Sequence, residues 1–172
     1  MYRILHRVRG FTMIELLVSI AIIGILSSIV IGGISNARAD SRDKQRLASV
    51  EQARLAIEIY REAYGQYPDV GCSRSATQWT GHGSNFGNCD VYVDGVSNII
   101  KLPTDPSNDV NGYIYRTNAT GSEFKFMSYN AVESETLTAS DEYARYPTGC
   151  SGSMSGGSAA SYAVYSEGAK CW

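Results

Sequence analysis

The 172-residue sequence is poor in the residues that most catalytic and metal sites require. It has only two histidines, His6 and His82, and its four cysteines never occur as a C-x2-C pair. This pattern disfavours a zinc site and excludes a thioredoxin-type redox site. A phosphate-binding P-loop and a G-x-S-x-G nucleophile elbow are also missing. The sequence therefore predicts no catalytic residues and a protein that is not an enzyme.

The chain also lacks an excess of positive charge. Its formal net charge is -2, and the first ten residues carry Arg3, Arg7 and Arg9 without any acid. Without these three, 12 basic residues face 17 acidic ones, a formal charge of -5. The remaining basic residues are scattered along the sequence, for example Lys125, Arg145 and Lys170. A nucleic-acid partner is therefore not expected.

Residues 16–34 contain neither a charged residue nor a proline. As a helix, such a segment spans about 28 Å, close to the hydrocarbon thickness of a bilayer. The basic residues before it predict a single pass through the cytoplasmic membrane, with the N-terminus inside and the rest exported. A cleaved secretory signal is the alternative, but its apolar region is shorter, and Ala37-Arg38-Ala39 is a poor cleavage site.

Glycine and proline are likewise absent from residues 41–64, where apolar residues recur every three or four positions. These positions are Leu47, Val50, Ala53, Ile57, Tyr60 and Tyr64, with Leu55, Ile59 and Ala63 widening the stripe and the charged residues on other faces. Gly65 and Pro68 mark the end of the pattern. We expect one helix from about 12 to 64, apolar all round in its first half and on one side in its second.

After residue 65, short strand-like segments alternate with turns. GYIYRTN (112–118) and EFKFMSYNAV (123–132) read as an antiparallel pair, and SYAVYSEG (161–168) as a third strand. The expected class is α+β, with the long helix packed on a small antiparallel sheet. We expect a transmembrane half of the helix over 11–35, an amphipathic half over 36–65 and a globular head over 66–172.

All four cysteines lie in the polar region expected to be exported. Cys72, Cys89, Cys150 and Cys171 can form two disulfides in three ways, and sequence alone does not decide between them. We favour the nearest-neighbour scheme, Cys72 with Cys89 and Cys150 with Cys171.

The stretch RGFTMIELLVSIAIIGILSSIV resembles the N-terminus of type IV pilins and of the pseudopilins of type II secretion. In that family a basic leader ending in glycine is cut before phenylalanine, the new N-terminus is methylated, and the fifth mature residue is glutamate. The matching positions here are Gly10, Phe11 and Glu15, so the leader would be residues 1–10. ARLAIEIYREAYGQYPDV and LPTDPSNDVNGYIYRTN further resemble the G-like major pseudopilins.

The resemblance implies a structural subunit that polymerises into a periplasmic or extracellular filament. Its implied partners are related pilin subunits, a prepilin peptidase, an assembly ATPase, a membrane platform protein and, before assembly, the inner-membrane lipid. A lone carboxylate in hydrocarbon is costly, and Glu15 would be neutralised by the new amino terminus of a neighbouring subunit. Pairing of Glu15 with Arg9 is the alternative in the uncut precursor.

Three functional alternatives stay open. A pseudopilin of type II secretion is favoured by the YGQYP and LPTDP segments. A pilin for adhesion, motility or DNA uptake is favoured by the cysteine-bearing loops. A membrane-anchored binding module is the alternative from another class.

The loop DPSNDVNG is rich in oxygen ligands, and the similar pseudopilins often carry calcium nearby. We name Asp105, Asn108, Asp109 and Asn111 as calcium candidates. An EF-hand is excluded, because Val110 and Arg116 occupy the positions that need glycine and glutamate. A turn cluster is the alternative, and otherwise no cofactor is expected.

Overall fold

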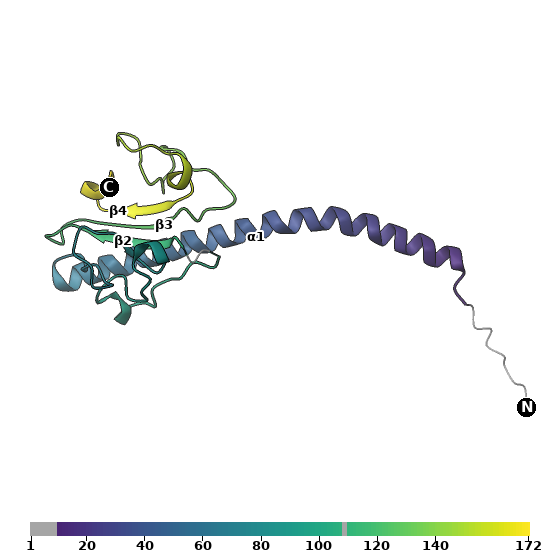
Figure 1. The fold of residues 1–172 in the computed structure, drawn as a ribbon, viewed down its shortest axis with the longest axis horizontal. Helices are drawn as coiled ribbons and strands as arrows, with labels where there is room; N and C mark the ends of the chain where they lie inside the picture. Colours follow the sequence, from purple (N-terminus) through teal and green to yellow (C-terminus); the bar gives the residue numbers. More distant parts are fainter. Residues whose placement is uncertain (1–9, 108–109) are drawn as a thin grey trace, which may run out of the picture. The chain divides into compact units, whose positions relative to one another are not determined.

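The computed structural model describes residues 10–107 and 110–172, with the side chains of 29–32 left aside. One long helix, α1 (Met13–Tyr64), precedes a four-stranded antiparallel sheet (Figure 1). The strands are β1 (Thr80–Gly81), β2 (Gly112–Thr117), β3 (Phe124–Tyr129) and β4 (Tyr162–Tyr165). The chain divides into two compact units, Met1–Arg38 and Ala39–Trp172. The α+β prediction is confirmed.

The helix α1 matches its predicted span to within one residue. It ends at Gly65, whose φ of +78° suits glycine and whose N–H donates to the Arg61 carbonyl at 2.8 Å. In the first unit, the described apolar side chains from Phe11 to Leu26 are exposed. By length and composition, the helix could cross a membrane.

The sheet is a simple meander in the order β1-β2-β3-β4. The predicted pair is β2–β3, whose register runs from Gly112 opposite Tyr129 to Thr117 opposite Phe124. The predicted third strand is β4, which pairs with β3. The two-residue strand β1 was not predicted, because two residues are too short to show a period.

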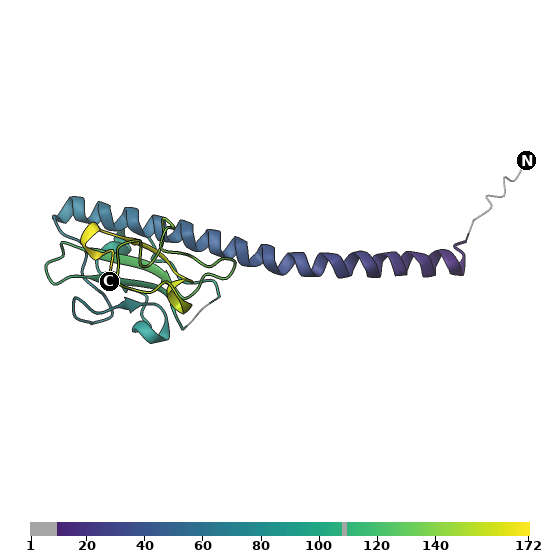
Figure 2. The ribbon, with the colours of Figure 1, turned by 90° about the horizontal axis from the view of Figure 1, so that it is seen from above.

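The sheet buries two different faces. The inner face packs against Val50, Ala53 and Ile57 of α1. In Figure 2 the C-terminal part of α1 runs along the sheet. The side chains of the inner face are Tyr113, Tyr115, Phe124, Phe126, Tyr162 and Val164. The outer face is centred on Ile114, Met127 and Ala163, flanked by Trp79, Phe86, Tyr129 and Tyr165. Alternating side chains on β2 and β3 produce the two faces.

Two predictions about α1 were wrong in detail. Leu55, Ile59 and Ala63 do not widen the buried stripe, and Tyr64 does not belong to it, since all four are exposed. Asp43 and Arg46, expected on a solvated face, are instead 2% and 0% exposed. Their burial depends on partners that come from distant loops, which helical periodicity does not reveal.

Arg46 is fully buried among three carboxylates. Its guanidinium donates to Asp105 at 2.7 and 2.8 Å, to Asp43 at 2.7 Å and to Glu133 at 2.8 Å. Arg42 pairs with Glu133 as well. The arrangement joins α1 to the loops around residues 105 and 133, and it satisfies a cation that would otherwise be costly to bury.

Asp43 extends this cluster to the main chain. Its carboxylate accepts the backbone N–H groups of Glu133 and Ser134 at 2.7–3.1 Å. Burial alone would raise the pKa of Asp43, but hydrogen bonds from Ser134, Arg46 and Glu133 lower it overall. The carboxylate therefore stays ionised and holds the loop after β3 against the helix.

Replacing Arg46 with alanine should destabilise the protein by about 3–5 kcal/mol, because it leaves buried carboxylates without their cation. The measurement is denaturant unfolding followed by near-ultraviolet circular dichroism. The matched control is Arg54→Ala, which removes a half-exposed partner of Glu51 and should cost about 0–1 kcal/mol. Equal losses in the two variants would contradict the role of Arg46.

Acid should weaken the cluster through Glu133. The hydrogen bond from Arg42 outweighs burial, and with Arg46 and Ser107 it lowers the pKa of Glu133 from 4.5 to about 2. The unfolded chain then takes up this proton first as pH falls, so the contribution is complete above about pH 4.5 and lost toward pH 2. The difference in Tm between wild type and Glu133→Gln should shrink over that range. A difference that does not change with pH would refute the assignment.

Candidate functional site: the N-terminal motif

The motif residues sit at the start of α1. Gly10 and Phe11 precede the helix and are exposed, Phe11 to 89%. Thr12 is the residue before the first helical position, and Glu15 is in the first turn. A peptidase could therefore reach the Gly10–Phe11 bond, and glycine leaves the backbone open to close approach. Residues 1–9 of the expected leader, with Arg9, lie outside the described residues.

Thr12 and Glu15 form a capping box. The backbone N–H and hydroxyl of Thr12 donate to Glu15 Oε2 at 3.0 and 2.9 Å, and the N–H of Glu15 donates back to Thr12 Oγ1 at 3.4 Å. Each side chain thus satisfies a backbone donor at the helix N-terminus. The carboxylate also lies at the positive end of the helix dipole.

This second task of Glu15 was missed in the sequence interpretation. The signal was present, because T-M-I-E has the S/T-x-x-E spacing of a capping box directly before an apolar run. Within the described residues no cation lies within 4 Å of Glu15. Both hydrogen bonds from Thr12 go to one oxygen, Oε2, so the carboxylate keeps capacity for a further donor.

The predicted nearest-neighbour pairing of the cysteines is confirmed. Cys72 bonds to Cys89, and Cys150 bonds to Cys171, with Cα–Cα distances of 5.6 and 5.2 Å. The first disulfide closes the loop that carries β1, and the second ties the segment after residue 149 to the end of the described chain.

Asp105 does not fit the expected role as a calcium ligand. Both its carboxylate oxygens accept hydrogen bonds from Arg46, and Ser107 N–H adds another at 3.0 Å. Asn111 Oδ1 accepts from Asn85 at 3.3 Å. Asn108 and Asp109 lie outside the described residues, so a calcium site without Asp105 stays a prediction.

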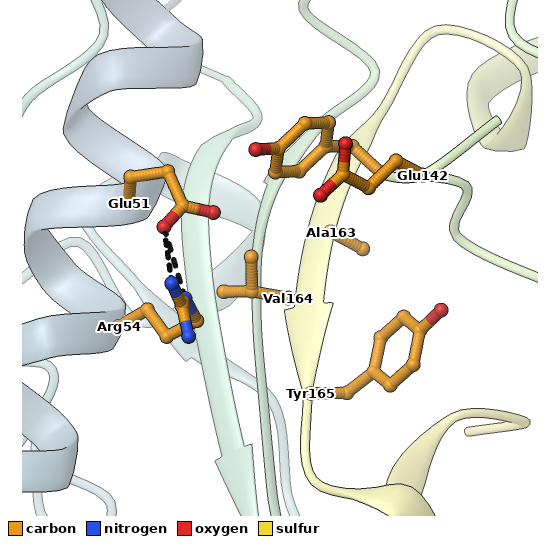
Figure 3. A pocket seen from close by; sticks show the side chains of 7 residues that line it. Glu51, Arg54, Glu142, Ala163, Val164 and Tyr165 are labelled. Carbon is orange, nitrogen blue, oxygen red and sulfur yellow. Dashed lines mark hydrogen bonds and ion pairs between the residues drawn. The ribbon is translucent and has the colours of Figure 1, made fainter.

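A shallow pocket of about 270 Å³ lies between α1 and β4 (Figure 3). Glu51 and Arg54 of α1 line one side as an ion pair at 2.8 Å, and Glu142 and Tyr165 lie opposite. None of its lining residues is a serine, cysteine or histidine. Elsewhere, His82 lies 3.4 Å from Asp90, a partner that was not expected.

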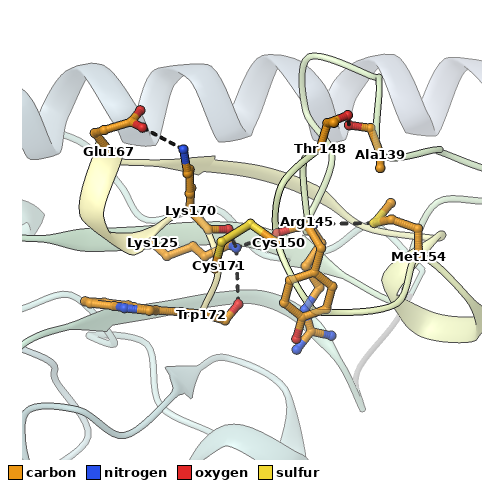
Figure 4. The surroundings of a disulfide bond; sticks show 11 residues. Lys125, Ala139, Arg145, Thr148, Cys150, Met154, Glu167, Lys170, Cys171 and Trp172 are labelled. Atoms are coloured by element: carbon orange, nitrogen blue, oxygen red, sulfur yellow. Dashed lines mark hydrogen bonds and ion pairs between the residues drawn. A yellow bond between two sulfur atoms is a disulfide. The ribbon is translucent and has the colours of Figure 1, made fainter.

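Lys125 and Arg145 are not scattered, as the sequence suggested, but adjacent. The buried Lys125 ammonium donates to the main-chain oxygens of Arg145, Lys170 and Trp172, beside the Cys150–Cys171 disulfide (Figure 4). Lys170 instead points away and pairs with Glu167. Only the fold brings positions 125 and 145 together.

Comparison with known proteins supports the reading of the N-terminus. Residues 5–31 match the family model of the prokaryotic N-terminal methylation motif. A fimbrial protein of Neisseria meningitidis serogroup A is 22% identical over 137 residues, which cover 78% of this chain and 81% of that protein. No solved structure matches the chain. With the long helix and small sheet, these matches make the chain similar to type IV pilins and pseudopilins.

Replacing Thr12 with alanine should fray the first turn of α1, because an N-cap hydroxyl contributes about 1 kcal/mol. Amide hydrogen exchange of residues 13–15 in detergent should accelerate roughly fivefold. Ser19→Ala is the matched control, since that hydroxyl only bonds the carbonyl of Glu15 within the helix. Unchanged exchange in Thr12→Ala would show that the capping box does not stabilise this turn.

Proposed function

We propose that the chain is a prepilin cut between Gly10 and Phe11 and methylated on Phe11. The mature subunit then assembles into a filament. In this proposal residues 11–35 lie in the membrane before assembly, with residues 1–10 inside, and the head is exported to the periplasmic or extracellular side. A prepilin peptidase, an assembly ATPase and a platform protein would serve these steps. The methylation motif and the fimbrial relative support this function.

The observation that carries the proposal is the isolated charge of Glu15. It lies in a segment whose described apolar side chains are exposed, and its carboxylate accepts hydrogen bonds from the N–H and the hydroxyl of Thr12. A carboxylate in an apolar helix bundle needs a cation. Cleavage after Gly10 creates an ammonium group on Phe11 with the same requirement, and methylation preserves its charge. Subunits offset along a filament would satisfy both at once.

The capping box makes this pairing specific. The bonds from Thr12 fix the Glu15 carboxylate over the first turn, so its position relative to the backbone is set before assembly. An incoming ammonium then meets an oriented acceptor rather than a mobile one.

The exposed side of α1 in the head supports assembly as well. Leu55, Ile59 and Ala63 line a shallow groove of about 420 Å³, bordered by Glu58 and Glu62. An exposed apolar groove on the helix is suited to contact with neighbouring subunits.

A type II secretion pseudopilin is the second candidate. It is favoured by the PTDPSND segment, whose Asp105 fixes the loop to Arg46 of the helix. The fimbrial relative and the two disulfides favour a surface pilin. Filaments labelled outside the cell would favour the pilin.

Glu15→Gln should still be cleaved but should assemble at least tenfold less, because an amide cannot neutralise the Phe11 ammonium. Cleavage is measured by mass spectrometry of the N-terminus, and assembly by electron microscopy and pelleting of sheared filaments. Filaments at the normal level would rule out the pairing.

Two controls separate processing from assembly. Gly10→Val should leave full-length precursor in the membrane, because the added side chain blocks approach to the backbone. Glu167→Gln removes a carboxylate that is 87% exposed on the head and should change neither step. A protein that stays membrane-anchored and monomeric after cleavage would favour the binding module instead.

A further inference from the structure

The outer face of the sheet carries two cations in a direct cross-strand pair. Arg116 on β2 lies opposite Lys125 on β3, and both belong to the face turned away from α1. Like charges placed directly opposite each other destabilise an antiparallel pair. Residues 66–172 contain more acidic than basic residues, so the positive charge on this face is opposite to the net charge of the head.

Lys125 is fully supplied with partners. Its ammonium donates to three main-chain oxygens and lies 5.1–5.2 Å from the ring centres of Tyr146 and Tyr165. Burial, with the charge of Arg145 nearby, lowers the pKa of Lys125 to about 7. Positive charge on this face is therefore costly. Lys125 adds to the positive charge beside Arg116 instead of neutralising it.

Arg116 is held by aromatic rings and by no acid. Its guanidinium lies 5.7 Å from the ring centre of Trp79 and 4.9 Å from that of Trp172. Among the described residues, no carboxylate oxygen lies within 4 Å of it. The acid of Glu123 lies instead against Gly168. The Nε–H of Arg116 is buried without an acceptor within the described residues.

The two disulfides hold the segments that carry these rings. Trp79 belongs to the loop closed by Cys72 and Cys89, and Trp172 directly follows Cys171. Figure 4 shows Trp172 extending beside Lys125 from this second disulfide. Rings fixed in this way stack on the guanidinium and orient its planar array of donors. The terminal amino groups of a guanidinium so oriented can bind an oxyanion from solvent, whereas the buried Nε–H is out of its reach.

We propose that Arg116 is the centre of an oxyanion site on the outer face, which takes a phosphate or sulfate group. A doubly charged tetrahedral anion fits better than a carboxylate, because it offsets the paired charges of Arg116 and Lys125 together. The group comes from a free ion or from a phosphorylated or sulfated polymer. This site does not depend on assembly, since it lies on the face opposite α1.

The experiment uses the two tryptophans of the chain, both of which contact Arg116. Full-length protein in uncharged detergent is titrated with sodium sulfate at constant ionic strength, with chloride as the balancing salt, and intrinsic fluorescence is recorded. We expect a saturable change in wild type and in Arg54→Gln, a matched loss of a guanidinium on α1. Arg116→Gln should abolish it, and Arg116→Lys should weaken binding tenfold or more, because the fork of donors is lost.

Two further measurements keep the test decisive. Near-ultraviolet circular dichroism shows whether Arg116→Gln is folded. If it is not, the comparison with wild type is made with Arg116→Lys. The second measurement is the Tm with and without sulfate. Sulfate raises the Tm of most proteins because it is excluded from their surface, so only a larger rise in wild type than in the Arg116 variants supports the site. A long-chain polyphosphate that competes with sulfate identifies a polymer source, and its failure to compete identifies a free ion. A response absent from wild type, or equal in the folded Arg116 variants, overturns the proposal.

Discussion

The constraint on which the rest of the structure depends is that one helix must serve two environments. The described apolar side chains of its first half are exposed, whereas its second half buries Val50, Ala53, Ala56 and Ile57 in the core of the head. Exposed apolar side chains are costly in water, so the first half needs an apolar environment that the second half does not. Glu15 caps the first turn of the apolar half, and the Arg46 cluster fastens the second half to the loops of the head.

The sequence predicts the long elements well because each has enough residues for its hydrophobic period to be recognised. The span of α1, the β2–β3 pair and β4 follow from absent glycine, apolar spacing and alternation. The Glu15 capping box could also have been read from T-M-I-E. By contrast, β1 has two residues and no period, so it becomes visible only when it pairs with Tyr115 and Ile114.

Charges were harder to place than apolar residues. Arg46 looks like any surface arginine on a helix, because its carboxylate partners at 105 and 133 are 59 and 87 positions away. Asp105 looked like a ligand for a metal for the same reason. Lys125 and Arg145 seemed dispersed until the loop after β3 brought them together. Long-range pairing of this kind leaves no local pattern in the sequence.

Lys125 gives the last part of the chain a further significance. The oxygens that receive its ammonium belong to residues 145, 170 and 172, all made after β3 itself. During synthesis from the N-terminus, β3 therefore carries a cation whose acceptors are missing until residues 145, 170 and 172 have been made. A chain that stopped before residue 145 would leave β3 without the main-chain oxygens that accept from this ammonium. The segment 145–172 is therefore a condition for burying β3, as well as a covering for the outer face of the sheet.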